Sequence, residues 1–166
     1  MRALRALSGL LTRIEGWALV LFLSIMIVLS FAQVLLRNLF GSGLIWGDQL
    51  VRQMVMWTGF TGAALAAAGN RHISIDALTK FLPARVRHAL RVLTNVFASV
   101  VCVYLMLAAW GLLLSERESG GEMFLAIPEW VGHVVIPAGY ALLAIHFLIN
   151  AVENGRAVFI KVGGKG

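Results

Sequence analysis

The sequence predicts an all-α integral membrane protein with four transmembrane helices. Four apolar runs without Asp, Glu, Lys or Arg, at residues 16–36, 53–70, 92–115 and 130–152, take up most of the 166-residue chain. A helix of about 20 residues crosses the ~30 Å hydrocarbon core of a bilayer, so three of these runs are long enough by themselves. Hydrophobic residues make up 60% of the chain and charged residues only 13%, which excludes an ordinary soluble domain.

The predicted spans extend slightly beyond the uncharged runs. They cover about residues 15–37, 46–69, 88–115 and 129–152, and together they form a single four-helix bundle domain over residues 1–166. The second run is the shortest and reaches full length only if residues 44–52 join it. That extension places Asp48 and Arg52 near the membrane surface. The connections are short, so none of them builds a soluble core of its own.

Basic residues are distributed unevenly among the connections. Of the 14 lysines and arginines, all but three lie before the first span, between the second and third, or after the fourth. Arg37, Arg52 and Arg117 lie on the opposite side with most of the acidic residues. The positive-inside rule therefore predicts that both termini are cytoplasmic. The same rule accounts for the net charge of +6, so no nucleic-acid partner is expected.

A short amphipathic segment is predicted between the second and third spans. Apolar and polar residues alternate over residues 73–82, and Pro83 then opens the third helix. This pattern predicts a short helix that lies in the membrane interface.

The fourth span carries a proline and a weak stripe of small residues. Pro137 predicts a kink within the span. Gly132, Gly139 and His146 recur every seven residues and so lie along one side of the helix, although Leu143 limits close approach there.

The spans contain almost no group that performs chemistry. His133 and His146 are the only titratable residues within the four runs, apart from tyrosines and the single cysteine. They face different directions about 20 Å apart and cannot share one metal, so each is expected to have a local hydrogen-bond partner or to lie at an interface. Glu15 is expected at the membrane interface beside Arg13. The chain shows no catalytic arrangement and no metal-ligand spacing, so neither an enzyme nor a cofactor is predicted.

Two other functions stay open at this point. A haem- or quinone-binding anchor of a respiratory complex would need histidines at matching depth on two helices, but His72 and His88 lie between the second and third uncharged runs, on the predicted cytoplasmic side. Its haem form would absorb visible light. A small self-sufficient exporter would need a carboxylate within the membrane, for which Glu15 is the only weak candidate.

The second span has one small, polar face. At 100° per residue Asp48, Arg52, Gly59 and Ala63 fall close to one line, whereas the bulky Trp57 lies on the far side. In lipid, small residues four positions apart let two helices approach closely. The face therefore predicts close packing, either within this chain or on another subunit. Asp48 and Arg52 are one turn apart and are able to pair.

Four short segments occur in a distinctive order. They are RNLFGSGLIWGDQLVR at residues 37–52, GAA at 62–64, HISID at 72–76 and IPAG at 136–139. Together they resemble the small membrane subunit of the tripartite ATP-independent periplasmic (TRAP) transporters, the DctQ family. That family typically has an arginine, a tryptophan, two adjacent acidic residues and a second arginine in the first of these segments. Here Gln49 replaces the second acidic residue.

The resemblance implies a non-catalytic scaffold in the bacterial inner membrane. Its partners would be a large DctM-type membrane subunit that carries substrate and sodium, a DctP-type periplasmic substrate-binding protein that delivers an organic acid, and membrane lipid. The identity of the acid belongs to the other subunits and cannot be read from this chain. The residues expected to contact partners are Arg37, Trp46, Asp48, Arg52, Gly59, Ala63, His72 and Asp76.

Overall fold

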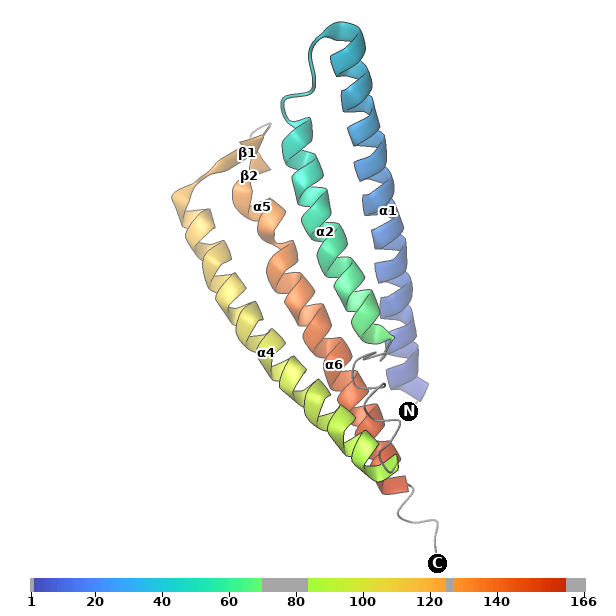
Figure 1. The fold of residues 1–166 in the computed structure, drawn as a ribbon. Helices are drawn as coiled ribbons and strands as arrows, with labels where there is room; N and C mark the ends of the chain where they lie inside the picture. The colour runs from blue at the N-terminus through green and yellow to red at the C-terminus, as the bar shows by residue number, and fades with distance from the viewer. Residues whose placement is uncertain (1, 70–83, 125–126, 161–166) are drawn as a thin grey trace, which may run out of the picture.

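The computed structural model describes residues 2–69, 84–124 and 127–160 and is almost entirely helical (Figure 1). Its helices are α1 (Arg2–Phe40), α2 (Gly47–Ala68), α4 (Ala84–Ser119), α5 (Glu129–His133) and α6 (Val135–Ile160). A small antiparallel hairpin of β1 (Glu122–Phe124) and β2 (Ile127–Pro128) joins α4 to α5. The all-α fold class is confirmed, and this hairpin is the one departure from it in the described ranges. The predicted interfacial helix at residues 73–82 lies outside them.

Three helices are long and apolar enough to cross a membrane. Within the described ranges they are the stretches Ser8–Phe40, Val86–Ser119 and Glu129–Gly155. α2 is not among these stretches, and it carries Asp48 and Arg52 together with several glycines and threonines. The three long stretches make this a multi-pass membrane protein.

The helices lie side by side in an open row, in the order α1, α2, α6 and α4 (Figure 1). α2 and α6 occupy the middle of the row, and α1 and α4 form its edges. This arrangement differs from the predicted bundle, because each edge helix keeps one side without a helical neighbour among the described residues. Both edge helices consequently carry many exposed Leu, Ile, Val and Phe side chains, a surface suited to lipid.

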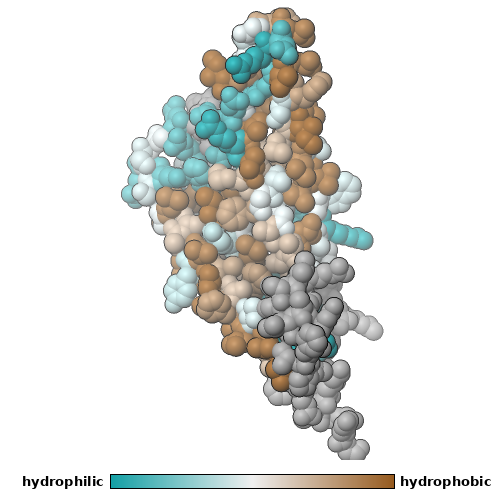
Figure 2. Space-filling model, viewed as in Figure 1, coloured by the Kyte–Doolittle hydropathy of each residue, from teal (hydrophilic) through white to brown (hydrophobic). Residues whose placement is uncertain are grey.

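Two glycines end the long edge helices. Gly41 follows α1 with φ 68°, and Gly120 follows α4 with φ 67°. This left-handed conformation costs other L-residues about 1–2 kcal/mol, so glycine is the usual residue after a helix C-terminus. Hydrophilic residues gather toward this end of the row, over the start of α2 and the hairpin (Figure 2).

Near the kink predicted from Pro137, the chain shows a one-residue break at Val134 between α5 and α6. Val134, at the break, keeps helical angles, and its N–H donates to the Trp130 carbonyl at 3.1 Å. Pro137 has no N–H for the carbonyl of His133, and its ring crowds that carbonyl. The break therefore falls one turn before the proline that causes it.

Candidate functional site

One face of α2 is exposed along the length of the helix. Exposed residues recur there every three or four positions and so line one side. They are Asp48, Arg52, Val55, Gly59, Ala63 and Ala66, which we call the α2 stripe. A Cβ added at Gly59 would meet nothing within 4 Å. The face predicted for close helix packing is therefore unused by the described part of the chain.

Trp57, on the far side of α2, fixes this helix between its neighbours. Its indole N–H donates to the Gly132 carbonyl at 3.1 Å, across to the α5 segment. Its ring also meets Phe22 of α1 edge-on, with ring centroids 5.4 Å apart. One side chain thus holds α2 to both adjacent elements of the row.

Gly139 allows α2 and α6 to approach closely. A Cβ at this position would collide with the ring of Phe60, which occupies the space. Phe60 also meets Tyr140 edge-on at 5.2 Å. The weak stripe predicted on the fourth span is therefore used inside the chain, whereas the described residues leave the α2 stripe uncovered.

Asp48 is bound by Gln33 of α1. With its amide oriented to satisfy both groups, Gln33 donates to Asp48 Oδ1 at 3.0 Å and accepts the Asp48 backbone N–H at 2.9 Å. Gly47 is needed beside this contact, because a Cβ there would collide with the Gln33 amide. Asp48 and Arg52, which the sequence leaves able to pair, do not pair with each other here, and neither residue forms an ion pair in the described ranges.

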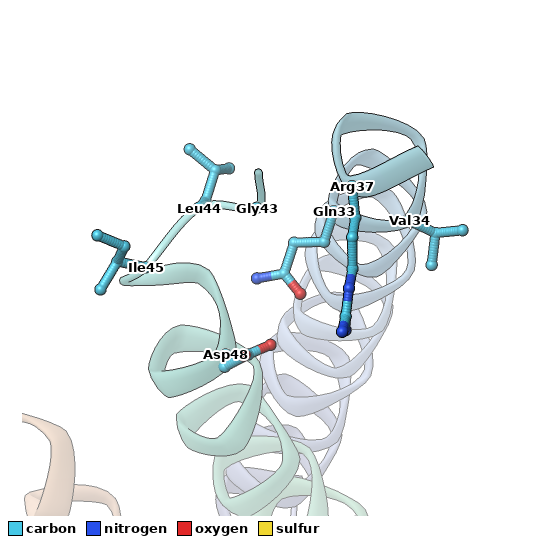
Figure 3. Close-up of a pocket in the computed structure, with 7 residues that line it drawn as sticks. All are labelled: Gln33, Val34, Arg37, Gly43, Leu44, Ile45 and Asp48. Atoms are coloured by element: carbon cyan, nitrogen blue, oxygen red, sulfur yellow. The ribbon is translucent and has the colours of Figure 1, made fainter. Parts of the chain in front are cut away.

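Arg37 lies at the same end of the row as this contact. Gln33, Arg37 and Asp48 point into an open pocket of about 320 Å³ next to the α1–α2 loop (Figure 3). Arg37 belongs to the last turn of α1, where a cation interacts favourably with the helix dipole. Trp46 is the residue before α2, and its carbonyl accepts the Leu50 N–H at 3.1 Å.

Arg52 lines a second polar pocket, of about 210 Å³, between α2 and α5. The other lining residues are Gln49, Gln53, Glu129 and His133. His133 Nδ1 lies within hydrogen-bond distance of Glu116 Oε2, at 2.7 Å. Gln53 Oε1, in contrast, is buried without a hydrogen-bond partner in the described ranges. The predicted contact residues Arg37, Trp46, Asp48 and Arg52 thus gather at one end of the row, and Gly59 and Ala63 continue from them along α2. His72 and Asp76 lie outside the described ranges.

A buried Glu–His pair joins α1 to α6 at the other end. His146 Nε2 lies 2.8 Å from Glu15 Oε1, and the two side chains are only 1% and 4% exposed. Glu15 does not lie beside Arg13 at the protein surface, because its side chain turns inward to the imidazole whereas Arg13 is exposed; its predicted depth at the membrane interface stays a prediction. The sequence held one indication of this contact, because Glu15 and His146 both lie toward the predicted cytoplasmic ends of their spans and therefore at similar depth in the membrane.

These arrangements offer surfaces for protein contact. In the ranges that the structure describes, no three His, Cys, Asp or Glu side chains come close enough to hold a metal ion. What comes together is a small-residue face with two polar pockets at one end, the pattern by which membrane helices associate.

The family model for the DctQ component of tripartite ATP-independent periplasmic transporters matches residues 26–157. This range includes all of α2, α4 and α5, residues 26–40 of α1 and most of α6. The chain belongs to the DctQ family. Its members are components of transporters, so this DctQ chain is a TRAP small permease subunit and not a respiratory membrane anchor.

Individual relatives of the DctQ chain carry matching names. It is 27% identical to the ectoine TRAP transporter small permease protein TeaB of Halomonas elongata, over 91% of this chain and 79% of TeaB. It is 23% identical to the C4-dicarboxylate TRAP transporter small permease protein DctQ of Vibrio cholerae, over 81% and 68% of the two chains. The sialic acid TRAP transporter permease protein SiaT of Haemophilus influenzae is 32% identical over 58% of this chain but only 16% of SiaT. No solved structure gives a significant match.

Proposed function

We propose that this DctQ chain is a non-catalytic scaffold in the bacterial inner membrane, which supports a large DctM-type subunit that carries substrate and sodium. The observation that carries the proposal is the exposed α2 stripe. Asp48 and Arg52 are costly on a surface that faces lipid, and Gly59 and Ala63 give lipid little to pack against. A protein partner would offer polar groups to the two charged residues and a closely packed surface to the two small ones. The edge helices, with their exposed aliphatic side chains, are left for lipid.

The match to SiaT supports a large membrane partner. Most of this chain aligns with 16% of SiaT, so a DctQ-like segment is a small part of that longer permease. Joining two associating parts in one chain raises their effective concentration without any new contact. A separate small subunit must achieve the same association through its surface.

The membrane topology we propose has four spans with both termini cytoplasmic. α2 has 22 residues and is about 33 Å long, enough to cross the hydrocarbon core, and it packs between two apolar helices. The start of α1 and the end of α6 lie at the same end of the row (Figure 1), as an even number of crossings requires.

Single cysteines from Ser119→Cys or Ser74→Cys, each in a Cys102→Ala background, test this topology. An impermeant reagent on the periplasmic side should label position 119 and not 74. The reverse result would overturn the topology.

The substrate we propose for the whole transporter is an organic acid, delivered by a DctP-type periplasmic binding protein. The relatives are named for ectoine, C4-dicarboxylate and sialic acid, although all three align with this chain. Such variety supports a small subunit that does not choose the substrate. Proteoliposomes that contain only this chain should therefore accumulate no C4-dicarboxylate under a sodium gradient, and uptake by them would contradict the scaffold role.

Assembly gives the direct test of the α2 stripe. Gly59→Leu should fold as an isolated chain, because space surrounds that position, but it should recover roughly tenfold less large subunit on co-purification. Gly111→Leu is the matched control: it is the same change at an exposed α4 glycine that also has nothing within 4 Å. Normal assembly of Gly59→Leu, or equal loss in both variants, would refute the proposed surface.

A further inference from the structure

An apolar groove of about 440 Å³ lies between α4 and α6. Its walls are Met106, Leu107 and Trp110 on one side and Val134, Pro137, Ala138 and Ala141 on the other. The volume falls in the ~300–1,000 Å³ range of small-molecule sites. Both walls belong to stretches apolar enough to cross a membrane, and Trp110 and Ala138 are exposed, so the groove opens toward hydrocarbon.

The groove has a physical cause in the sequence of α6. Pro137 breaks the helix at Val134, and the small side chains of Ala138 and Ala141 leave room opposite Trp110. Elsewhere α4 packs closely, as the buried Ala109 shows. The opening is therefore local and narrow. A helix with its side chains is about 10–12 Å wide and does not fit between two helices that already touch, whereas a single hydrocarbon chain does.

A cation lies above the groove on the same side of α4. Arg117 follows Trp110 by seven residues, which places it on nearly the same line and about 10 Å further along the helix. Its guanidinium carbon lies 5.9 Å from the centroid of the Trp130 ring. Trp130 precedes Pro137 by seven residues, so it stands above the opposite wall. Arg117 forms no ion pair in the described ranges and keeps its donors available.

We infer that the α4–α6 groove binds one membrane phospholipid, with an acyl chain between Trp110 and Ala138 and the phosphate at Arg117. The two parts of the site demand one molecule that joins a hydrocarbon chain to an anion about 10 Å away. Arginine binds phosphate through parallel N–H donors, and a tryptophan at the headgroup level is a usual neighbour. The inference stands independently of the partner proposed for the α2 stripe, because it uses α4, α5 and α6 only.

Lipid retention tests this site. The full chain is purified in mild detergent, and bound phospholipid is counted by native mass spectrometry. Ala138→Leu should fill the groove and abolish retention, whereas Ala108→Leu, on the far side of α4, should retain one lipid. Arg117→Gln should weaken retention roughly tenfold, and the exposed Arg13→Gln should not. Equal lipid content in Ala138→Leu and Ala108→Leu would overturn the site, and equal content in the two arginine variants would overturn the phosphate contact.

A second measurement separates the whole lipid from its parts. Delipidated chain is heated with phosphatidylethanolamine, with oleate or with glycerol phosphate, and its Tm is recorded. Because a ligand that binds only the folded state raises Tm, phosphatidylethanolamine should raise Tm in the unsubstituted chain and in Ala108→Leu but not in Ala138→Leu. Oleate and glycerol phosphate should each have a much smaller effect. An equal shift with either fragment, or the same lipid response in Ala138→Leu, would contradict binding of a whole phospholipid in the groove.

Discussion

His146 and Glu15 form a buried hydrogen bond that ties α6 to α1 past the helix between them. The 2.8 Å separation of Nε2 and Oε1 is that of an imidazole N–H donating to a carboxylate. At the opposite end of α1, Gln33 binds Asp48 of α2. The edge helix is therefore fastened at both ends by polar contacts. In lipid, apolar packing alone does not specify which helices associate, so these polar contacts help to fix the position of α1 beside its neighbours.

The first prediction concerns this buried pair. Glu15→Ala should lower the free energy of unfolding by about 1–3 kcal/mol, because it leaves the imidazole buried without its acceptor. Glu15→Gln keeps an acceptor oxygen and should cost less. Unfolding by SDS, followed by circular dichroism, measures both. The exposed Arg13→Ala serves as the control one half-turn away, and a Glu15→Ala chain as stable as that control would show that the bond contributes nothing.

Trp57 gives the second prediction. Trp57→Phe should keep an edge-on contact with Phe22 but lose the N–H bond to Gly132, at a cost of about 1 kcal/mol. Trp57→Leu should lose both contacts and cost roughly 0.5–1.5 kcal/mol more. The same unfolding measurement ranks the two variants. If Trp57→Phe and Trp57→Leu lower the free energy of unfolding equally, the aromatic contact with Phe22 does not contribute to stability.

The amino-acid pattern predicted the helices, because a bilayer leaves so few alternatives. Uncharged runs of span length located the three apolar stretches, and Pro137 anticipated the break in the last of them. The α2 stripe was also foreseen as a face, since a 100° repeat is a local property of the chain. Its exposure was not, because the sequence does not say which neighbour fills a given side.

Long-range partners escaped prediction for physical reasons. In lipid, both the interior and the outer surface are apolar, so hydropathy does not reveal that the helices form a row. Glu15 and His146 are 131 residues apart, and no periodicity links them. Gln33 lies inside an uncharged run, where a single amide carries no signal. In the sequence, Arg52 is only one helical turn from Asp48 and is the obvious partner, whereas the partner in the structure is Gln33 of another helix.

The third prediction compares two glycines. In a helix Gly→Ala normally stabilises by up to about 1 kcal/mol, and Gly59→Ala should do so because its surroundings are open. Gly139→Ala should instead destabilise by about 1–3 kcal/mol, since its Cβ would displace the Phe60 ring. Thermal unfolding of the isolated chain should therefore move in opposite directions. Adding Phe60→Leu should recover part of the Gly139→Ala loss, and a full loss that persists would show that Phe60 is not the obstacle.

The last prediction asks which residue Asp48 depends on. A double-mutant cycle with Gln33→Ala and Asp48→Ala should give a coupling of roughly 0.6 kcal/mol or more, because the two side chains share hydrogen bonds between α1 and α2. The cycle with Asp48→Ala and Arg52→Ala should give a coupling within about 0.3 kcal/mol of zero. For the same reason the exchange of Asp48→Arg with Arg52→Asp should not restore the stability lost in Asp48→Arg, since Gln33 would still lack its acceptor. Full recovery in the exchanged chain would show that the two charges pair in the membrane after all, and that Gln33 merely lies nearby.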